Sequence, residues 1–296
     1  MSLRSLGDGV WARAIDFYPD AYVEYGFSDG GRRVRDPLNR RARRTFLRLT
    51  NHFFYMPAGR PTPLARVSRA PRGSIERVDV DASPYAGSPR RRVHLYTPPV
   101  RGRLPLLVAL DGDEYLRRAR LATIADNLIA QHRIRPIAIA FVQGGGRARV
   151  LEYACNEATL EMLLERVLPL ARERIDLERS AGGHGILGSS LGGLMALFAG
   201  LRAPRVFGKV LSQSGSFALG GRDFVVFDLV RSLPRRPLRI WMDVGHLETL
   251  RAPNRRMRRA LAARGYDVTY REYHAGHHWP AWRDEVWRGL ETLFAP

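Results

Sequence analysis

Residues 188–192 fit the pattern G-x-S-x-G, in which a serine stands at a sharp corner between a strand and a helix. The apolar residues before the pattern predict a strand, and residues 191–201 predict a helix. Little room remains beside such a serine, which favours glycine at positions 188 and 192. The backbone N–H of Leu191 would then face any oxyanion that forms at Ser190. The pattern indicates a nucleophilic serine, although an ordinary glycine-rich turn fits it too.

An acidic residue and a histidine follow this serine in the order Ser, Asp/Glu, His that an α/β-hydrolase requires. Residues 238–244 and 267–273 are predicted strands. Glu248 follows the first of these strands and His277 follows the second. Parallel strands present their carboxyl ends at one edge of a sheet, so the three side chains are expected there together. We predict Ser190 as the nucleophile, His277 as the general base and Glu248 as the acid that orients it.

These assignments have alternatives. Asp243, at the end of the strand before Glu248, is the rival acid. Glu248 is preferred because a loop carboxylate can reach over the sheet edge to a histidine. His277 is preferred over His278 because a preceding glycine allows a tight turn. Together with His274 these histidines could form a metal site, but no carboxylate or further ligand has suitable spacing. Neither a metal nor another cofactor is expected.

Oxyanion and substrate contacts are predicted on neighbouring loops. The second oxyanion donor is expected after the third strand, from the backbone N–H of Asp113 or Gly112, although an Asp-Gly pair is also common in plain turns. Candidate substrate-binding residues lie after a run of three glycines at 144–146 and beside the histidine, and they are Arg149, Glu152, Tyr153, His278 and Trp279. For Arg149 and Glu152, the alternative is an internal arginine–glutamate pair that holds the loop.

The rest of the chain alternates strands and helices from about residue 72. Predicted strands cover 75–80, 92–96, 104–110, 136–142 and 209–212, and predicted helices cover 117–131, 157–174, 255–263 and 281–294. A loop at 83–87 joins the first two strands, and residues 220–237 resemble a lid. We predict an α/β-hydrolase fold, with a mostly parallel central sheet and helices on both faces. Residues 72–296 form the catalytic domain. Residues 1–71 form a short β-rich segment and linker, too small for a core of its own.

Composition limits the other classes of function. The formal charge is +19, but Lys209 is the one lysine, so the charge is almost all arginine and is spread along the chain. No recognisable nucleic-acid-binding module surrounds these arginines. A basic surface would instead attract anionic substrates. No apolar run approaches about eighteen residues, and no signal peptide is evident at the start. Cys155 is the single cysteine. These features predict a cytoplasmic protein without a membrane span.

Several ordered motifs between residues 72 and 296 resemble those of the esterase D-like α/β-hydrolases, and among them the enterochelin (ferric enterobactin) esterases. The motifs cover residues 110–112, 149–153, 188–193, 212–216, 243–248 and 276–283. The resemblance implies catalytic roles for Ser190 and His277, with an acid at the place of Glu248. Residues 36–39 resemble the end of the β-sandwich domain of those esterases, which makes the N-terminal segment a shortened remnant.

We therefore predict a serine esterase that hydrolyses carboxylic esters through an acyl-enzyme. The resemblance implies a ferric catecholate siderophore, or a similar anionic or aromatic ester, as substrate. An acyltransferase and a feruloyl or small-acyl esterase are the alternatives on the same fold. A non-catalytic binding protein with the hydrolase fold is the alternative from another class. Nucleic-acid binding is a further alternative, and it predicts an affinity for DNA or RNA that falls steeply with salt concentration. A homodimer is left open.

Overall fold

The computed structural model describes residues 2–44, 50–83, 85 and 89–296, and its internal contacts divide the chain into two units. The first unit comprises Met1–Arg60 with His274–Gly276, and the second comprises Pro61–Tyr273 with His277–Pro296. The sequence-based boundary at residues 71 and 72 therefore lies inside the second unit. Of the predicted loop at 83–87, residues 84, 86 and 87 lie outside the described part of the chain.

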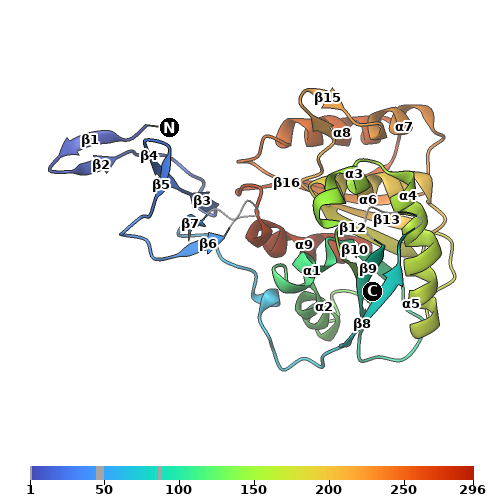
Figure 1. The fold of residues 1–296 in the computed structure, drawn as a ribbon. Helices are drawn as coiled ribbons and strands as arrows, with labels where there is room; N and C mark the ends of the chain where they lie inside the picture. The colour runs from blue at the N-terminus through green and yellow to red at the C-terminus, as the bar shows by residue number, and fades with distance from the viewer. Residues whose placement is uncertain (1, 45–49, 84, 86–88) are drawn as a thin grey trace. The chain divides into compact units, whose positions relative to one another are not determined.

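An eight-stranded sheet forms the centre of the second unit (Figure 1). Its strand order is β17-β16-β13-β12-β10-β11-β9-β8. The strands from β17 to β11 are parallel to one another, whereas β9 is antiparallel to β11 and β8 to β9. The strands are β8 (Ser74–Asp81), β9 (Arg90–Thr97), β10 (Leu106–Leu110), β11 (Ala138–Val142), β12 (His184–Ser189), β13 (Phe207–Gln213), β16 (Arg239–Gly245) and β17 (Asp267–Tyr273). This arrangement confirms the predicted mostly parallel sheet.

Helices cover both faces of the sheet, so the central strands β10 and β11 are buried on both sides. Along β10, Leu106, Val108 and Leu110 belong to one buried cluster, and Leu107 and Ala109 belong to the other. The first cluster includes residues of α4 to α8, and the second includes residues of α1, α2 and α9. The helices are α1 (Gly112–Arg117), α2 (Leu121–Ala130), α3 (Arg149–Tyr153), α4 (Glu157–Met162), α5 (Leu168–Arg174), α6 (Leu191–Arg202), α7 (Val226–Ser232), α8 (Arg251–Ala263) and α9 (Trp279–Leu293).

Three predicted elements differ in detail from the structure. The helix expected at 117–131 is α2, which starts only at Leu121 because Arg120 before it adopts a left-handed backbone conformation with φ 53°, and the expected loop after Asp111 forms the separate short helix α1. The helix expected at 157–174 contains a π-helical turn, η3 (Leu163–Val167), between α4 and α5. The insertion at 220–237 holds β15 (Arg222–Asp223), paired with β14 (Ala218–Leu219), and then α7. Two short 3-10 helices, η1 (Pro63–Ala65) and η2 (Gly146–Ala148), complete this unit's described elements.

The first unit is rich in short β-strands, as predicted. Its strands pair antiparallel as β1 with β2, β4 with β5, and β7 with both β3 and β6. Aromatic rings pack on one another within it, with the centroids of Tyr22 and Tyr55 4.8 Å apart and those of Tyr25 and Phe54 5.9 Å apart. The strands are β1 (Arg4–Gly7), β2 (Val10–Ala12), β3 (Tyr22–Tyr25), β4 (Phe27–Asp29), β5 (Arg32–Val34), β6 (Ala42–Arg44) and β7 (Thr50–Tyr55).

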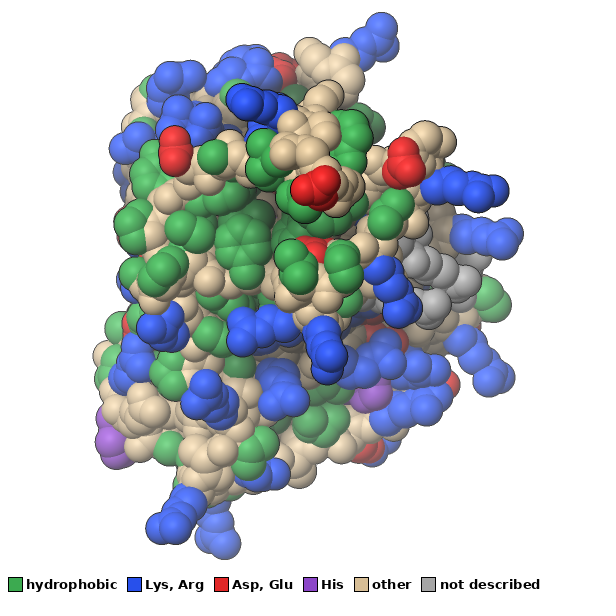
Figure 2. Space-filling view, turned by 90° about the vertical axis from the view of Figure 1, so that its left-hand side faces the viewer, with side chains coloured by type: hydrophobic (Ala, Val, Ile, Leu, Met, Phe, Trp, Pro, Cys, Tyr) green, Lys and Arg blue, Asp and Glu red, His purple; other side chains and the backbone are tan. Residues whose placement is uncertain are grey.

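Basic side chains appear at many places on the face shown in Figure 2 rather than in a single patch. Many arginines pair with acids, as Arg255 does with Glu272 at 2.6 Å and Arg271 with Glu285 at 2.7 Å. The spread expected from the sequence is therefore present on this face. Of the helices in the described part of the chain, none combines the length and the apolar composition needed to cross a membrane.

Candidate active site

Ser190 stands at the corner between β12 and α6 with a backbone conformation that is rare for a non-glycine residue, φ 59° and ψ −122°. Hydrogen bonds from one segment hold it on both sides. Its N–H donates to the carbonyl of Gln213 at 2.9 Å, and its carbonyl accepts from the N–H of Ser216 at 3.0 Å. These contacts fix the strained turn that lifts the hydroxyl to the carboxyl edge of the sheet.

The two glycines of the G-x-S-x-G pattern differ in how tightly they are enclosed. A Cβ atom at Gly188 would lie 2.3 Å from the backbone of Gly192, which is far closer than real Cβ atoms approach. A Cβ atom at Gly192 would first meet Oδ2 of Asp111 at 3.4 Å, which is ordinary contact. Glycine is therefore needed at position 188, as expected, whereas at Gly192 the structure leaves room for a methyl group.

Glu248 and His277 meet at the same edge of the sheet, beyond the ends of β16 and β17. Oε2 of Glu248 lies 2.7 Å from Nδ1 of His277. Oε1 of the same carboxylate accepts from the hydroxyl of Ser214 at 2.7 Å and from the N–H of Gly245 at 2.8 Å. The buried carboxylate is therefore held in one orientation. With Nδ1 donating to Glu248, Nε2 of the more exposed imidazole is the nitrogen that can accept a proton.

Asp243 has a different environment. Its side chain is buried within β16, and Oδ2 accepts from Nε1 of Trp241 at 2.9 Å and from Nε2 of Gln213 at 3.2 Å. Burial raises the pKa of Asp243 to about 8, so its carboxyl is mostly neutral near pH 7. A neutral carboxyl cannot stabilise an imidazolium by its charge. The structure thus brings Glu248, rather than the rival Asp243, to His277.

The hydroxyl of Ser190 points to another serine in this structure. Its Oγ lies 3.2 Å from Oγ of Ser216, and within the described residues this is its one hydrogen bond, so none joins it to His277. Catalytic hydrogen bonds are often long in the absence of substrate and shorten when it binds. The ring of His277 packs edge-on against Trp282, with centroids 4.8 Å apart.

The proposed oxyanion donors lie at two helix N-termini. Leu191 is the first residue of α6 and Gly112 the first of α1, and backbone N–H groups in the first turn of a helix have no acceptor within it. A Cβ atom at Gly112 would lie 2.2 Å from the backbone of Phe141, so glycine allows α1 to start this close to β11. The side chain of Asp113 faces His94, with Oδ1 3.1 Å from Nε2. These donors stay predictions.

Arg149 lies beside the Ser190 turn, with Nη2 3.5 Å from the carbonyl oxygen of Ser189, but it is already paired. Nε and Nη2 contact the two carboxylate oxygens of Asp111, each at 2.6 Å. Tyr153 is buried, and its hydroxyl accepts from the N–H of Asp111 at 3.1 Å. Glu152 is buried too and pairs at 2.6 Å with Arg91 of β9, a residue that the sequence analysis missed. Glu152 and Tyr153 therefore support the glycine loop and Asp111 from inside. Of the three, Arg149 retains some exposure.

The histidines near residue 277 are divided between the two units, with His277 and His278 in the second and His274 in the first. His278 precedes α9, and its carbonyl accepts from the N–H of Trp282 at 3.1 Å. His274 belongs to the other unit, where its ring stacks on Tyr18 at 3.8 Å and Nδ1 lies 2.5 Å from Asp20. Across the described ranges, no group of three or more His, Cys, Asp or Glu side chains is arranged to hold a metal.

Trp279, the other proposed contact next to the histidine, is half-buried at the start of α9. Its ring packs edge-on against Tyr115 at 5.1 Å and against Trp282 at 4.9 Å. Tyr115 in turn donates to Oε1 of Gln213 at 3.0 Å. Trp279 is therefore part of an aromatic layer beside the site. Because its ring is partly exposed, it could contact substrate, and this role stays a prediction.

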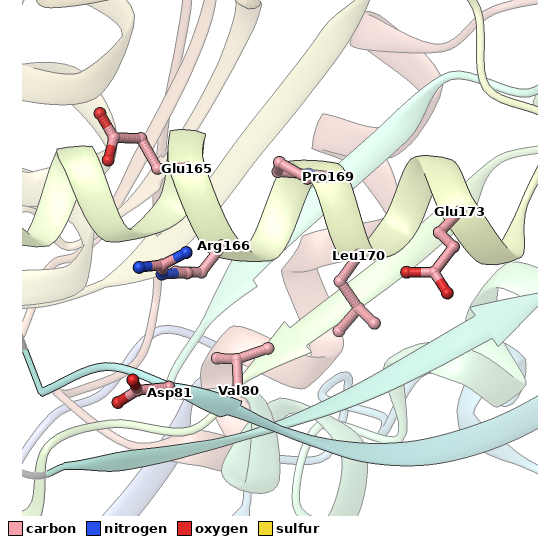
Figure 3. Close-up of a pocket in the computed structure, with 7 residues that line it drawn as sticks. All are labelled: Val80, Asp81, Glu165, Arg166, Pro169, Leu170 and Glu173. Atoms are coloured by element: carbon pink, nitrogen blue, oxygen red, sulfur yellow. The ribbon is translucent and has the colours of Figure 1, made fainter.

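A pocket of about 390 Å³ lies elsewhere, between the end of β8 and the helical segment η3 to α5 (Figure 3). None of its lining residues belongs to the candidate site. Three of them are acids and one is an arginine, so the lining would repel an anionic ligand. Its residues are Val80, Asp81, Glu165, Arg166, Pro169, Leu170 and Glu173. We do not assign it to the substrate.

A family model described as a putative esterase matches residues 86–293. The chain belongs to this putative esterase family. Among curated proteins, this esterase-family chain is 30% identical over 224 residues to an iron(III) enterobactin esterase of Dickeya dadantii, covering 69% of this chain and 52% of that protein. It is 27% identical over 200 residues to an iron(III) enterobactin esterase of Escherichia coli K12, covering 65% and 50%. The chain spans about half the length of these curated relatives.

Solved structures show the same fold for this esterase-family chain. The enterobactin esterase of Shigella flexneri, crystallised in the presence of enterobactin, is 25% identical with a TM-score of 0.77, covering 87% of this chain and 68% of that one. A ferric enterobactin esterase of Salmonella typhimurium has a TM-score of 0.80 at 21% identity, over 98% of this chain and 83% of that one. The predicted resemblance to enterochelin esterases and the α/β-hydrolase fold are confirmed.

Proposed function

We propose that this chain is a serine esterase in which Ser190 attacks the ester carbonyl and His277 transfers the proton. The observation that carries the proposal is the 2.7 Å contact between Glu248 and Nδ1 of His277, at the sheet edge where the strained Ser190 turn also ends. That contact leaves Nε2 free to act as a base, and the buried carboxylate favours the imidazolium that forms. Nucleophile, base and orienting acid are thereby all supplied.

The proposed reaction has two halves. Ser190 Oγ bonds to the carbonyl carbon while its proton moves to His277 Nε2, and the tetrahedral intermediate expels the alcohol, which takes that proton. Water then attacks the acyl-enzyme with the same base and releases the acid. The N–H groups of Leu191 and of Asp113 or Gly112 would stabilise the oxyanion, and the dipole of α6 favours negative charge at its N-terminus.

For the substrate, we propose an iron(III) catecholate siderophore ester of the enterobactin type. The support is the set of relatives named as iron(III) enterobactin esterases. The formal charge of +19 agrees, because basic surfaces raise the local concentration of anionic ligands. Arg149 and Trp279, both partly exposed beside the site, are the proposed contacts. Location in the cytoplasm stays a prediction, which cell fractionation would test.

Hydrolysis of p-nitrophenyl acetate and butyrate by the wild type and by Ser190→Ala tests the ester chemistry. A fluorophosphonate label followed by mass spectrometry identifies the nucleophile. We expect turnover and labelling at Ser190, both lost in the variant. Iron(III) enterobactin is then supplied, and ring-opened products are sought by chromatography. Folded wild-type protein that neither turns over these esters nor takes the label would contradict the proposal.

A further inference from the structure

Residues 212–216, at the end of β13 and in the turn that follows, contact both the Ser190 turn and the Glu248 carboxylate. The backbone of Gln213 and Ser216 holds the Ser190 turn from both sides, as described above. The hydroxyl of Ser212 donates to the carbonyl of Gly193 at 3.0 Å, in the first turn of α6. Because β13 lies between β12 and β16 in the sheet, its end faces both the nucleophile and the acid.

Two hydroxyls of this segment reach the reacting groups. Ser216 Oγ lies 3.2 Å from Ser190 Oγ. Ser214 Oγ donates to Oε1 of Glu248 at 2.7 Å and accepts from Nε1 of Trp282 at 3.0 Å. Trp282 also packs edge-on against the ring of His277. Ser214 is thus joined to the histidine through the carboxylate and through the tryptophan.

The turn that carries the two serines is itself fixed from several directions. Ser214 has a left-handed backbone with φ 48°, and its N–H donates to the carbonyl of Asp243 at 2.7 Å. The carbonyl of Gly215 accepts from Nδ2 of Asn254 in α8 at 2.8 Å. A Cβ atom at Gly215 would lie 2.4 Å from the ring of Phe217, so a larger residue at this position would displace that ring. Both hydroxyls are therefore presented by a rigid turn.

We propose that Ser214 and Ser216 are the positioning residues of this reaction, a proposal that rests on the esterase function above. Either hydroxyl can donate in the 3.2 Å contact between Ser190 and Ser216; with Ser216 as the donor, the proton of Ser190 is free to turn toward Nε2 of His277. Ser214 occupies Oε1 of Glu248, which leaves Oε2 for Nδ1 of His277. One rigid turn thereby sets the orientation of the nucleophile and of the acid together.

Each serine has its own expected signature. Ser216→Ala should lower kcat, and the rate of fluorophosphonate labelling at Ser190, by about tenfold with little change in KM, the usual size of one lost neutral hydrogen bond. Ser214→Ala removes a donor from the Glu248 carboxylate, whose charge then favours the imidazolium of His277 more strongly. The acidic limb of the pH profile of kcat/KM should therefore move to higher pH, while in Ser216→Ala it stays in place.

The experiment measures both variants with p-nitrophenyl butyrate between pH 5 and pH 9, next to Ser190→Ala. Ser216→Thr, which keeps a hydroxyl, should recover most of the lost rate. Ser180→Ala, at an exposed loop position, is the matched control with wild-type kinetics. Thermal unfolding verifies that each variant is folded. A folded Ser216→Ala with wild-type kcat and labelling overturns the proposal, and so does a Ser214→Ala with the wild-type pH profile.

The result separates this proposal from the esterase function itself. If Ser190→Ala abolishes turnover while the other two serine variants match the wild type, the function stands and the positioning role fails. If wild-type protein neither turns over the ester nor takes the label at Ser190, the function fails, and the positioning role falls with it.

Discussion

Glu248 holds Nδ1 of His277 with one carboxylate oxygen at 2.7 Å, and its other oxygen is occupied by Ser214 and the N–H of Gly245. The loop acid after β16 is thus bound on both sides before substrate arrives. Asp243, only a few residues earlier, is turned to Trp241 and Gln213. This division between two nearby carboxyl groups leads to two different predictions.

The first prediction concerns activity. Glu248→Ala should lower kcat/KM for p-nitrophenyl butyrate by at least about a hundredfold, because His277 loses its orienting charge and hydrogen bond. Asp243→Asn should stay within about threefold of the wild type, because a neutral side chain replaces a mostly neutral one. Steady-state kinetics at pH 7.5 measure both. The reverse order of effects would make Asp243 the functional acid.

The second prediction concerns stability at alkaline pH. Burial raises the pKa of Asp243 from 3.8 to about 8, so the folded state binds a proton more tightly than the unfolded chain. This contribution to stability is complete below about pH 4 and is lost as the pH rises through about 8. Asp243→Asn should therefore gain stability relative to the wild type between pH 5 and pH 9. Urea unfolding measures this gain, with the exposed Asp228→Asn as a control that shows no such trend.

The third prediction concerns acid. His184 is buried, and its Nδ1 accepts from the N–H of Leu106 at 3.1 Å. Burial lowers the pKa of His184 from 6.5 to about 4, so here the unfolded chain binds the proton more tightly. This contribution to stability is complete above pH 6.5, and it declines by up to about 1.4 kcal/mol per pH unit between pH 6.5 and pH 4.

His184→Asn should flatten the decline of unfolding free energy between pH 6.5 and pH 4.5, although the variant is less stable than the wild type at pH 7.5. Urea titrations at several pH values give the slope. The exposed His132→Asn is the control, and it should keep the wild-type slope. An unchanged slope in His184→Asn would show that other groups cause the acid sensitivity.

The fourth prediction compares the two glycines beside Ser190. Gly188→Ala should cost about 3 kcal/mol of unfolding free energy or prevent folding, because the new methyl group would overlap the backbone of Gly192. Gly192→Ala should change it by no more than about 1 kcal/mol, since only ordinary contact with Asp111 results and alanine favours the helix. Soluble yield and thermal unfolding test the pair. Equal losses in both variants would contradict this difference.

The sequence predicts the sheet well where strands are buried on both faces. The segments that became β10 and β11 are continuous apolar runs, and such runs indicate parallel strands under two helical layers. The late start of α2 was not predictable, because Arg120 takes up a left-handed conformation where no glycine or proline marks the chain, and the short helix α1 was predicted as a loop. The π-helical turn within the long helix also has no simple sequence signal.

In the candidate site, the proposed catalytic residues were predictable from the sequence and the residues that hold them were not. Ser190, Glu248 and His277 each follow a predicted strand, so their place at one edge of the sheet follows from sheet topology. The partners that hold them do not follow, because these contacts join residues far apart in the chain. Ser214 lies 34 positions from Glu248, and Arg91 lies 61 positions from Glu152. Only the packed structure shows which oxygen of a carboxylate remains available.

The outer strand β8 has a consequence for how copies of this chain behave in a crowded cell. It ends the large sheet on one side and is exposed along most of its length. Unpaired backbone at such a border invites strand-to-strand joining between molecules. Glu76, Arg77, Asp79 and Asp81 place a charge at every second position or closer along this border. Pairing two β8 strands from different molecules would remove water from many charged side chains, which costs free energy. The charges on β8 therefore disfavour edge-to-edge aggregation of the sheet.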